Sequence, residues 1–492
     1  TERDKEDPRR LNWMGDGSNT LGYIDKSRDA KGNRVYQWMA ISAPFEGQPW
    51  EVAVGDRNFR SFGWTTAGTP WFQTRGDSAE EAIVQLIIDQ KIVELWRGRA
   101  ADRYSNPGRA VRINGSDGPV LEDDGRLFLA GDGLSDAGPQ PFLDTVELRT
   151  GRVERLYSAQ AKTYEPVLGI VETEPLSFIT SRESASEHPN LYFHRQGQKS
   201  AMSPLPDPYP QLQGVSRQVL NYKRADGLDL SATLYLPRDY VKGQRLPTLV
   251  WIYPHDFSDQ AEAEQVDIRA FRFHRVIGPS ALAAVAAGYA VLMNPTMPIL
   301  HSDIDSNEGY LPQLVASAEA AVNTLVEMGV TDPARVAVGG RSYGAFSAAN
   351  LLVHSDIFAT AIAMSGAYNR TLTPFGFQHE HRSFWDAMGM YTKVSPFFHA
   401  DEYNEPILLV HGGNDENAGT LPLQAWRFFH ALVGEGATVR YVELPYEGHH
   451  YWARESVLLA AAEMLDWLDR TIGPEAGLET HKVPVGGKKG PR

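Results

Sequence analysis

The sequence contains one G-x-S-x-G motif, Gly340-Arg341-Ser342-Tyr343-Gly344, where a strand pattern gives way to a helix pattern. Apolar residues 336–338 lead into the glycines, and residues 345–352 have the composition of a helix. A serine in such a tight turn adopts strained backbone dihedrals, and the flanking glycines let neighbouring backbone pass without a Cβ clash. We therefore predict that Ser342 is the nucleophile of a serine hydrolase.

An acid and a base follow the serine, each directly after a predicted strand. Residues 406–410 form one apolar run and lead to Asp415, and residues 438–444 form the next and lead to His449. The order serine, acid, histidine is that of α/β hydrolases. We predict that His449 takes the serine proton and that Asp415 orients and stabilises the imidazole. Glu416 is the alternative acid and His450 the alternative base, and Gly448 favours His449 because it allows a tight loop.

Two groups are predicted to stabilise the oxyanion of the tetrahedral intermediate. The backbone N–H of Tyr343 is the first, because it follows the nucleophile directly. In many hydrolases a backbone N–H after the third strand is the second donor, but residues 247–253 are followed here by Pro254, which has no N–H. The hydroxyl of Tyr253 is the natural substitute.

The elements that position these residues alternate between strand and helix in the second half of the chain. Apolar runs predict buried strands, and apolar residues at helical spacing predict helices over residues 311–325, 423–432 and 457–468. This alternation indicates a mostly parallel sheet covered on both faces, that is, an α/β hydrolase domain over residues 206–475.

The first part of the chain has a different pattern. Residues 1–205 contain short alternating runs separated by glycine and aspartate turns, which predict an all-β domain that forms part of a β-propeller. Residues 203–210 contain four prolines and are predicted to form a linker between the domains. Residues 476–492, rich in glycine and lysine at their end, are expected to be a flexible tail.

Composition excludes several classes of protein. The net charge of -15 argues against nucleic acid as a partner, and the absence of cysteine excludes disulfides and thiolate metal sites. His379-Glu380-His381 lacks the further ligands of a metal site, so we expect neither metal nor cofactor. No apolar run is long enough to span a bilayer, and we expect a soluble protein without a membrane partner. Because the chain starts at Thr1, we expect a processed or truncated N-terminus, which leaves bacterial cytoplasm, periplasm and secretion open.

Several stretches together resemble the prolyl oligopeptidase family of serine peptidases, and within it the glutamyl endopeptidase branch of chloroplasts and bacteria. They are residues 339–346, 365–377, 437–442 and 453–456, together with the tyrosine after the third strand. The resemblance implies an endopeptidase or oligopeptidase that acts on peptides or unfolded polypeptides and cleaves after glutamate. A carboxylesterase or lipase on the same fold is the alternative, because the triad does not distinguish esters from amides.

Cleavage after glutamate implies a cationic pocket for the substrate side chain, for which arginine is suited. The candidates near the catalytic elements are Arg370, Arg382 and Arg454, and we favour Arg370. The resemblance also implies a complete propeller, of which residues 1–205 supply about half. The rest is expected in a longer precursor that was truncated or proteolysed, or on another chain or protomer of a homo-oligomer.

Overall fold

The computed structural model describes residues 9–473 except 15–17, 29–30, 33, 56–58, 77–80, 100–101, 114, 116–117, 162, 258 and 302–306. The predicted tail, residues 476–492, lies outside the described residues. The chain divides into two compact units. The first comprises Thr1–Asp207 and Gln265–His274, and the second comprises Pro208–Glu264 and Arg275–Arg492.

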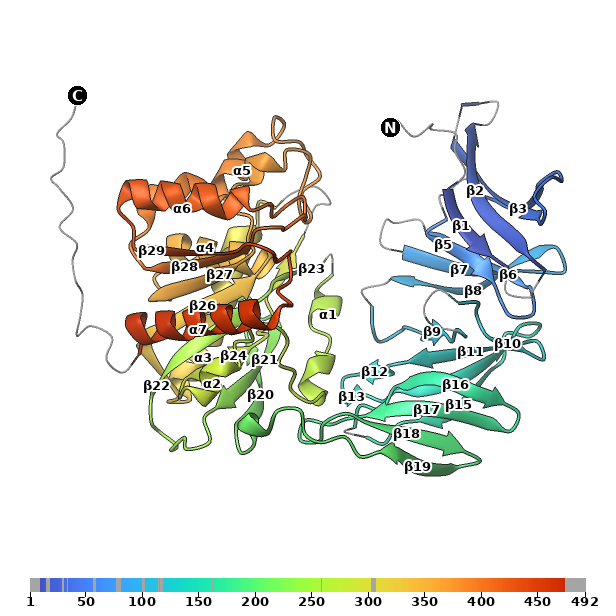
Figure 1. Ribbon diagram of the computed structural model, residues 1–492, viewed down its shortest axis with the longest axis horizontal. Helices are drawn as coiled ribbons and strands as arrows, with labels where there is room; N and C mark the ends of the chain where they lie inside the picture. The colour runs from blue at the N-terminus through green and yellow to red at the C-terminus, as the bar shows by residue number, and fades with distance from the viewer. Residues whose placement is uncertain are drawn as a thin grey trace. The chain divides into compact units, whose positions relative to one another are not determined.

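The first unit consists of antiparallel sheets that follow one another along the chain (Figure 1). The first sheet is β1 (Arg9–Trp13), β2 (Thr20–Arg28), β3 (Arg34–Ser42) and β4 (Trp50–Gly55), and the second is β5 (Ser61–Trp64), β6 (Pro70–Arg75), β7 (Glu81–Ile88) and β8 (Lys91–Arg99). The third is β9 (Arg109–Ala110), β10 (Glu122–Asp123), β11 (Arg126–Gly131), β14 (Phe142–Glu147) and β15 (Val153–Ser158), with the hairpin β12 (Leu134–Ser135) and β13 (Gly138–Pro139) beside it in sequence. The fourth is β16 (Val167–Thr173), β17 (Leu176–Arg182), β18 (Asn190–Arg195) and β19 (Gln198–Ser203).

Separate apolar clusters join each of these sheets to the next. Trp38 of the first sheet packs with Phe62 and Trp64 of the second. Successive residues of β11 point to opposite faces, as the two-residue period of a strand requires, so Leu127 joins the cluster with the second sheet and Phe128 the cluster with the fourth. Sheets stacked face to face in chain order are the arrangement of propeller blades, as the sequence predicts.

A short segment from the second half of the sequence completes the first unit, which the sequence pattern does not reveal. In Gln265–His274, Arg272 pairs with the buried Glu183 at 2.9 Å, and the Phe273 N–H donates to the same carboxylate. At the start of the segment, the side-chain oxygen of Gln265 accepts from the Arg103 N–H at 2.9 Å. Polar contacts thus anchor both ends of the segment.

The second unit is built on one eight-stranded sheet, in the order β20-β21-β24-β22-β26-β27-β28-β29 (Figure 1). Its strands are β20 (Ser216–Lys223), β21 (Asp229–Leu236), β22 (Leu246–Ile252), β24 (Ala290–Met293), β26 (Thr331–Arg341), β27 (Thr360–Met364), β28 (Ile407–Gly412) and β29 (Val439–Leu444). The first two strands are antiparallel to their neighbours, and the strands from β24 to β29 run parallel. A small parallel pair, β23 (His255–Phe257) and β25 (Pro298–Leu300), accompanies the sheet.

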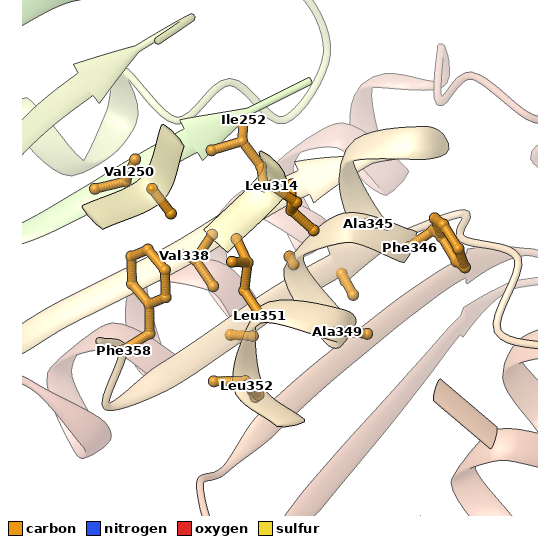
Figure 2. Packing of buried hydrophobic residues seen from close by; sticks show 14 of the residues in the cluster. Val250, Ile252, Leu314, Val338, Ala345, Phe346, Ala349, Leu351, Leu352 and Phe358 are labelled. Atoms are coloured by element: carbon orange, nitrogen blue, oxygen red, sulfur yellow. The ribbon is translucent and has the colours of Figure 1, made fainter. Parts of the chain in front are cut away.

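Helices cover both faces of this sheet. The helices of this unit are α1 (Gln260–Ala263), which contacts β23 and β25, and α2 (Ala283–Ala286), α3 (Tyr310–Glu327), α4 (Tyr343–His354), α5 (Met388–Lys393), α6 (Leu423–Glu435) and α7 (Arg454–Thr471), which pack on the large sheet. Leu409 of β28 packs in the core formed with α3, α4 and α6, whereas the adjacent Leu408 packs in the core formed with α2 and α7. Figure 2 shows the first of these cores, with Val338 of β26 close to Leu351 of α4. A parallel sheet buried on both faces confirms the predicted α/β hydrolase fold.

Within the described residues, the helices are all too short or too polar to cross a membrane.

Candidate active site

Ser342 lies in the turn between β26 and α4 with dihedral angles that are rare for a residue with a side chain, φ 57° and ψ −118°. Its N–H donates to the carbonyl of Met364 on the neighbouring strand at 2.8 Å, which holds the turn against the sheet. The glycines on either side are sterically required. A Cβ on Gly340 would lie 2.5 Å from the carbonyl carbon of Gly344, and a Cβ on Gly344 would lie 2.2 Å from the carbonyl oxygen of Ile252. The turn is thus a strained nucleophile elbow.

Asp415 and His449 follow β28 and β29, which run parallel to β26, so all three predicted residues lie at the same edge of the sheet. The Nδ1 atom of His449 lies 2.8 Å from Oδ2 of Asp415. Of the two alternatives, Glu416 and His450 are both exposed, whereas Asp415 is buried. The structure therefore brings together the acid and the base that the sequence favours.

Three further groups surround the Asp415 carboxylate. The Asn417 N–H donates to Oδ1 at 2.9 Å, the Thr420 hydroxyl donates to Oδ2 at 3.0 Å, and Nε2 of the buried His411 lies 3.3 Å from Oδ2. Burial alone would raise the pKa of Asp415, but hydrogen bonds from His411, His449 and the Asn417 N–H outweigh it and hold the pKa well below its ordinary value. The carboxylate is therefore ionised at neutral pH. Sequence reasoning did not single out these supporting groups, because no motif marks them.

The loop that presents His449 is closed by a buried carboxylate. Glu447 accepts hydrogen bonds from the N–H groups of Trp452 at 2.8 Å and Ala453 at 2.9 Å, just before α7 begins. Burial and the nearby Arg341 lower the pKa of His450, the next residue in this loop. The two hydrogen bonds that Glu447 accepts fix the path of the chain before and after His449.

Ser342 and His449 are both half-buried. In the part of the chain that the structure describes, the Ser342 hydroxyl has no hydrogen-bond partner, and the only bonded nitrogen of His449 is Nδ1. In hydrolases of this kind, the bond between nucleophile and base commonly tightens when substrate binds. The Ser342 hydroxyl and the Nε2 atom of His449 are thus both available to a ligand.

The two predicted oxyanion donors lie beside the elbow. Tyr343 is the first residue of α4, and the first N–H groups of a helix have no partner within the helix. Its buried ring meets the ring of Tyr253 edge to face, with centroids 6.2 Å apart. Tyr253 follows β22 directly. Its side chain is 41% exposed, so the residue is not part of the buried core.

Arg370 occupies an unusual environment for a cation. It is only 4% exposed, and its guanidinium carbon lies 4.3 Å from the ring centroid of Phe346 and 4.6 Å from that of Phe377. Among the described residues, no carboxylate pairs with it, and its Nε atom is buried without a hydrogen-bond partner. Burial lowers its pKa to about 10, so it is still charged at neutral pH.

The other two predicted arginines differ from Arg370. Arg382 makes hydrogen bonds of 2.8 Å to both carboxylate oxygens of the buried Glu380, and these bonds raise its pKa. Arg454 is exposed at the first position of α7. Only Arg370 combines burial with the absence of an acidic partner in the described part of the site.

Comparisons with known proteins show which families and structures this chain resembles. The prolyl oligopeptidase family matches residues 313–475. A protein named probable glutamyl endopeptidase, chloroplastic, from Arabidopsis thaliana is 37% identical, over 95% of this chain and 52% of the relative. A protein of the same name from Oryza sativa subsp. japonica is 41% identical, over 94% of this chain and 53% of the relative. The chain therefore spans about half the length of the curated relatives that it matches.

Solved structures share the fold at low sequence identity. Dipeptidyl peptidase 4 of Porphyromonas gingivalis has a TM-score of 0.66 at 15% identity, covering 95% of this chain and 64% of that one. The acylaminoacyl peptidase of Pyrococcus horikoshii has a TM-score of 0.57 at 16% identity, covering 96% and 83%. These structures share the fold, and the family match together with the curated relatives shows that this chain carries a domain of the prolyl oligopeptidase family.

Proposed function

We propose that this chain hydrolyses peptide bonds through Ser342, Asp415 and His449, by way of an acyl-enzyme, and that it prefers glutamate on the acyl side of the cleaved bond. The observation that carries the triad is the 2.8 Å contact between His449 and the buried Asp415, at the sheet edge where Ser342 stands in its elbow. The observation that carries the glutamate preference is the buried guanidinium of Arg370, which forms no ion pair with any described residue.

The mechanism follows from these groups. The Ser342 hydroxyl attacks the substrate carbonyl while Nε2 of His449 takes its proton, and Asp415 holds the imidazole in the tautomer that leaves Nε2 free. The Tyr343 N–H and the Tyr253 hydroxyl stabilise the oxyanion. The tetrahedral intermediate then collapses, and the leaving amine receives the proton from His449. A water molecule attacks the acyl-enzyme in the same way and releases the acid and the serine.

Arg370 supports the glutamate preference on energetic grounds. A charged group in a dry environment is costly unless an opposite charge accompanies it. Asp256 attracts the guanidinium of Arg370, but no carboxylate among the described residues forms an ion pair with it. A Cβ on Gly419 would lie 3.9 Å from Nη1 of Arg370, and Phe346 is in the first turn of α4, so the guanidinium lies between the elbow helix and the loop that follows Asp415. A substrate carboxylate that enters here supplies the missing charge, and the planar guanidinium suits bidentate binding.

The same triad would also hydrolyse esters, but nothing in the comparisons favours a carboxylesterase. The curated relatives are named as endopeptidases, and both solved structures described above are peptidases.

A fluorophosphonate probe and a peptide library test the proposal together. We expect the probe to label the wild-type protein and not Ser342→Ala, and the wild type to cleave library peptides after glutamate. Absence of labelling would contradict the serine mechanism. Labelling with cleavage after other residues would contradict the glutamate preference and leave the triad standing.

A further inference from the structure

The hydroxyl of Thr420 touches both the proposed acid and the proposed base. Its Oγ1 atom lies 3.0 Å from Oδ2 of Asp415 and 3.0 Å from Nδ1 of His449, and these two atoms are 2.8 Å apart. The three polar atoms thus form a nearly equilateral triangle. Thr420 is itself 6% exposed, so water does not compete easily for these contacts.

The direction of each hydrogen bond in the triangle follows from the chemistry of the atoms. An ionised carboxylate only accepts, so the Thr420 hydroxyl donates its proton to Asp415. The Nδ1–H of His449 donates to the same carboxylate oxygen, and the remaining lone pair of the Thr420 hydroxyl faces this N–H as a second acceptor. The Thr420 hydroxyl therefore donates to Asp415 and accepts from His449 at the same time.

The backbone of Thr420 is also held in place. Its carbonyl oxygen accepts a hydrogen bond from Nε2 of His411 at 2.7 Å, and His411 is fully buried at the end of β28. The loop from Asp415 to Thr420 is thereby tied to the strand from which it emerges. This anchor keeps the hydroxyl at a fixed place relative to the carboxylate.

We infer that Thr420 is a positioning residue for the His449–Asp415 pair, an inference that rests on the proposed function of this site. The hydroxyl restrains rotation of the carboxylate and fixes the plane of the imidazole. It also gives the Nδ1–H a second acceptor when His449 becomes positively charged during acylation. A side chain of the same shape without the hydroxyl would leave Oδ2 of Asp415 with fewer donors in a buried environment, where a lost hydrogen bond to a charge is costly.

Three variants test this role. Thr420→Val keeps the shape and removes the hydroxyl, Thr420→Ser keeps the hydroxyl, and Thr248→Val removes a buried hydroxyl from β22 that bonds Thr331 at 2.8 Å. We expect Thr420→Val to lower kcat by about tenfold to a hundredfold, with KM within about twofold of wild type. Thr420→Ser should restore most of kcat, and Thr248→Val should leave it unchanged. Equal losses in the valine and serine variants, or none in either, would overturn the inference.

A spectroscopic readout keeps this test separate from the test of peptidase activity. A proton shared between an imidazole and a carboxylate resonates far downfield in the proton NMR spectrum, and His449→Ala identifies its signal by removing it. We expect Thr420→Val to shift or broaden this signal and Thr420→Ser to retain it. An unchanged signal in Thr420→Val overturns the positioning role even if the protein cleaves no peptide. Failure of the fluorophosphonate probe to label wild type contradicts the proposed function instead.

Discussion

The guanidinium carbon of Arg370 lies 4.3 Å from the ring centroid of Phe346, four residues after Ser342. A second ring, that of Phe377, lies 4.6 Å away, so two aromatic side chains flank the cation. Cation–π contacts offset part of the cost of burying the charge, and no described residue accepts a hydrogen bond from the Nε atom of Arg370. The structure thus places a cation beside the first turn of the helix that follows Ser342.

Replacement of Arg370 should change the choice of substrate more than the chemistry. We expect Arg370→Met to lower kcat/KM for a substrate with glutamate before the cleaved bond by on the order of 100-fold, because the substrate carboxylate would then be buried without a partner. The matched substrate with glutamine should lose little. Arg454→Met, which alters an exposed arginine, should leave the ratio between the two substrates unchanged. Equal losses on both substrates in Arg370→Met would remove Arg370 from this role.

Removal of the Asp415 charge should abolish most of the activity without changing the shape of the site. In Asp415→Asn an amide can donate to Nδ1 of His449 and so favour the tautomer with the proton on Nε2, which cannot accept the serine proton. We expect kcat to fall by about 10⁴-fold. Steady-state kinetics on a chromogenic peptide measures the loss, and circular dichroism checks that the variant is folded. A loss of less than about tenfold would argue that another group orients His449.

The lowered pKa of Asp415 also predicts how stability depends on pH. A carboxyl whose pKa is lower in the folded than in the unfolded protein stabilises the fold above its unfolded pKa of about 3.9, and this contribution is lost as the pH falls through the folded pKa. As the pH falls from about 5 to about 2, the difference in free energy of unfolding between wild type and Asp415→Asn should therefore change in favour of the variant. Urea unfolding across this range measures it. If the difference in free energy of unfolding instead moves in favour of wild type over this range, the pKa of Asp415 is not lowered in the folded protein.

The elbow tolerates no side chain at Gly344. In Gly344→Ala the new Cβ would meet the Ile252 carbonyl oxygen at 2.2 Å. The backbone fixes the position of a Cβ, and its partner is a backbone atom, so neither can move without shifting the main chain. We expect a loss of stability of about 1–3 kcal/mol and a loss of probe labelling at Ser342. Gly389→Ala in α5 is the control, because a Cβ there meets nothing within 4 Å. Thermal unfolding of both variants checks the contrast, and an equally stable Gly344→Ala would show that the elbow can relax.

Much of this site could be predicted because its residues stand at the ends of strongly patterned elements. The run before Asp415 is apolar on both faces of the sheet, so β28 and its exit loop are evident in the sequence. Parallel strands bring their carboxyl ends to one edge, which places Ser342, Asp415 and His449 together without any knowledge of side chains.

The remaining features depend on the paths of loops, which sequence patterns do not define. Thr420 reaches Asp415 only because the intervening loop turns back, and it looks like any other loop threonine in the sequence. The three candidate arginines are likewise equivalent in sequence. The structure distinguishes them, because Glu380 pairs with Arg382 while rings from two separate segments enclose Arg370. Such pairings depend on tertiary packing rather than on local pattern.

The last prediction concerns the hydroxyl of Tyr253, which we propose as an oxyanion donor because the next residue has no backbone N–H. Pro254 has no N–H, and the exposed Tyr253 ring is braced edge to face against Tyr343. Tyr253→Phe keeps this ring contact and removes only the hydroxyl, so KM should change little while kcat falls by about 10²–10³-fold, the usual cost of one oxyanion donor. The probe should still label Ser342, since the nucleophile and its base are intact. If kcat in Tyr253→Phe stays within about threefold of wild type, the second oxyanion donor lies elsewhere in the site, since the loss of a true donor is far larger.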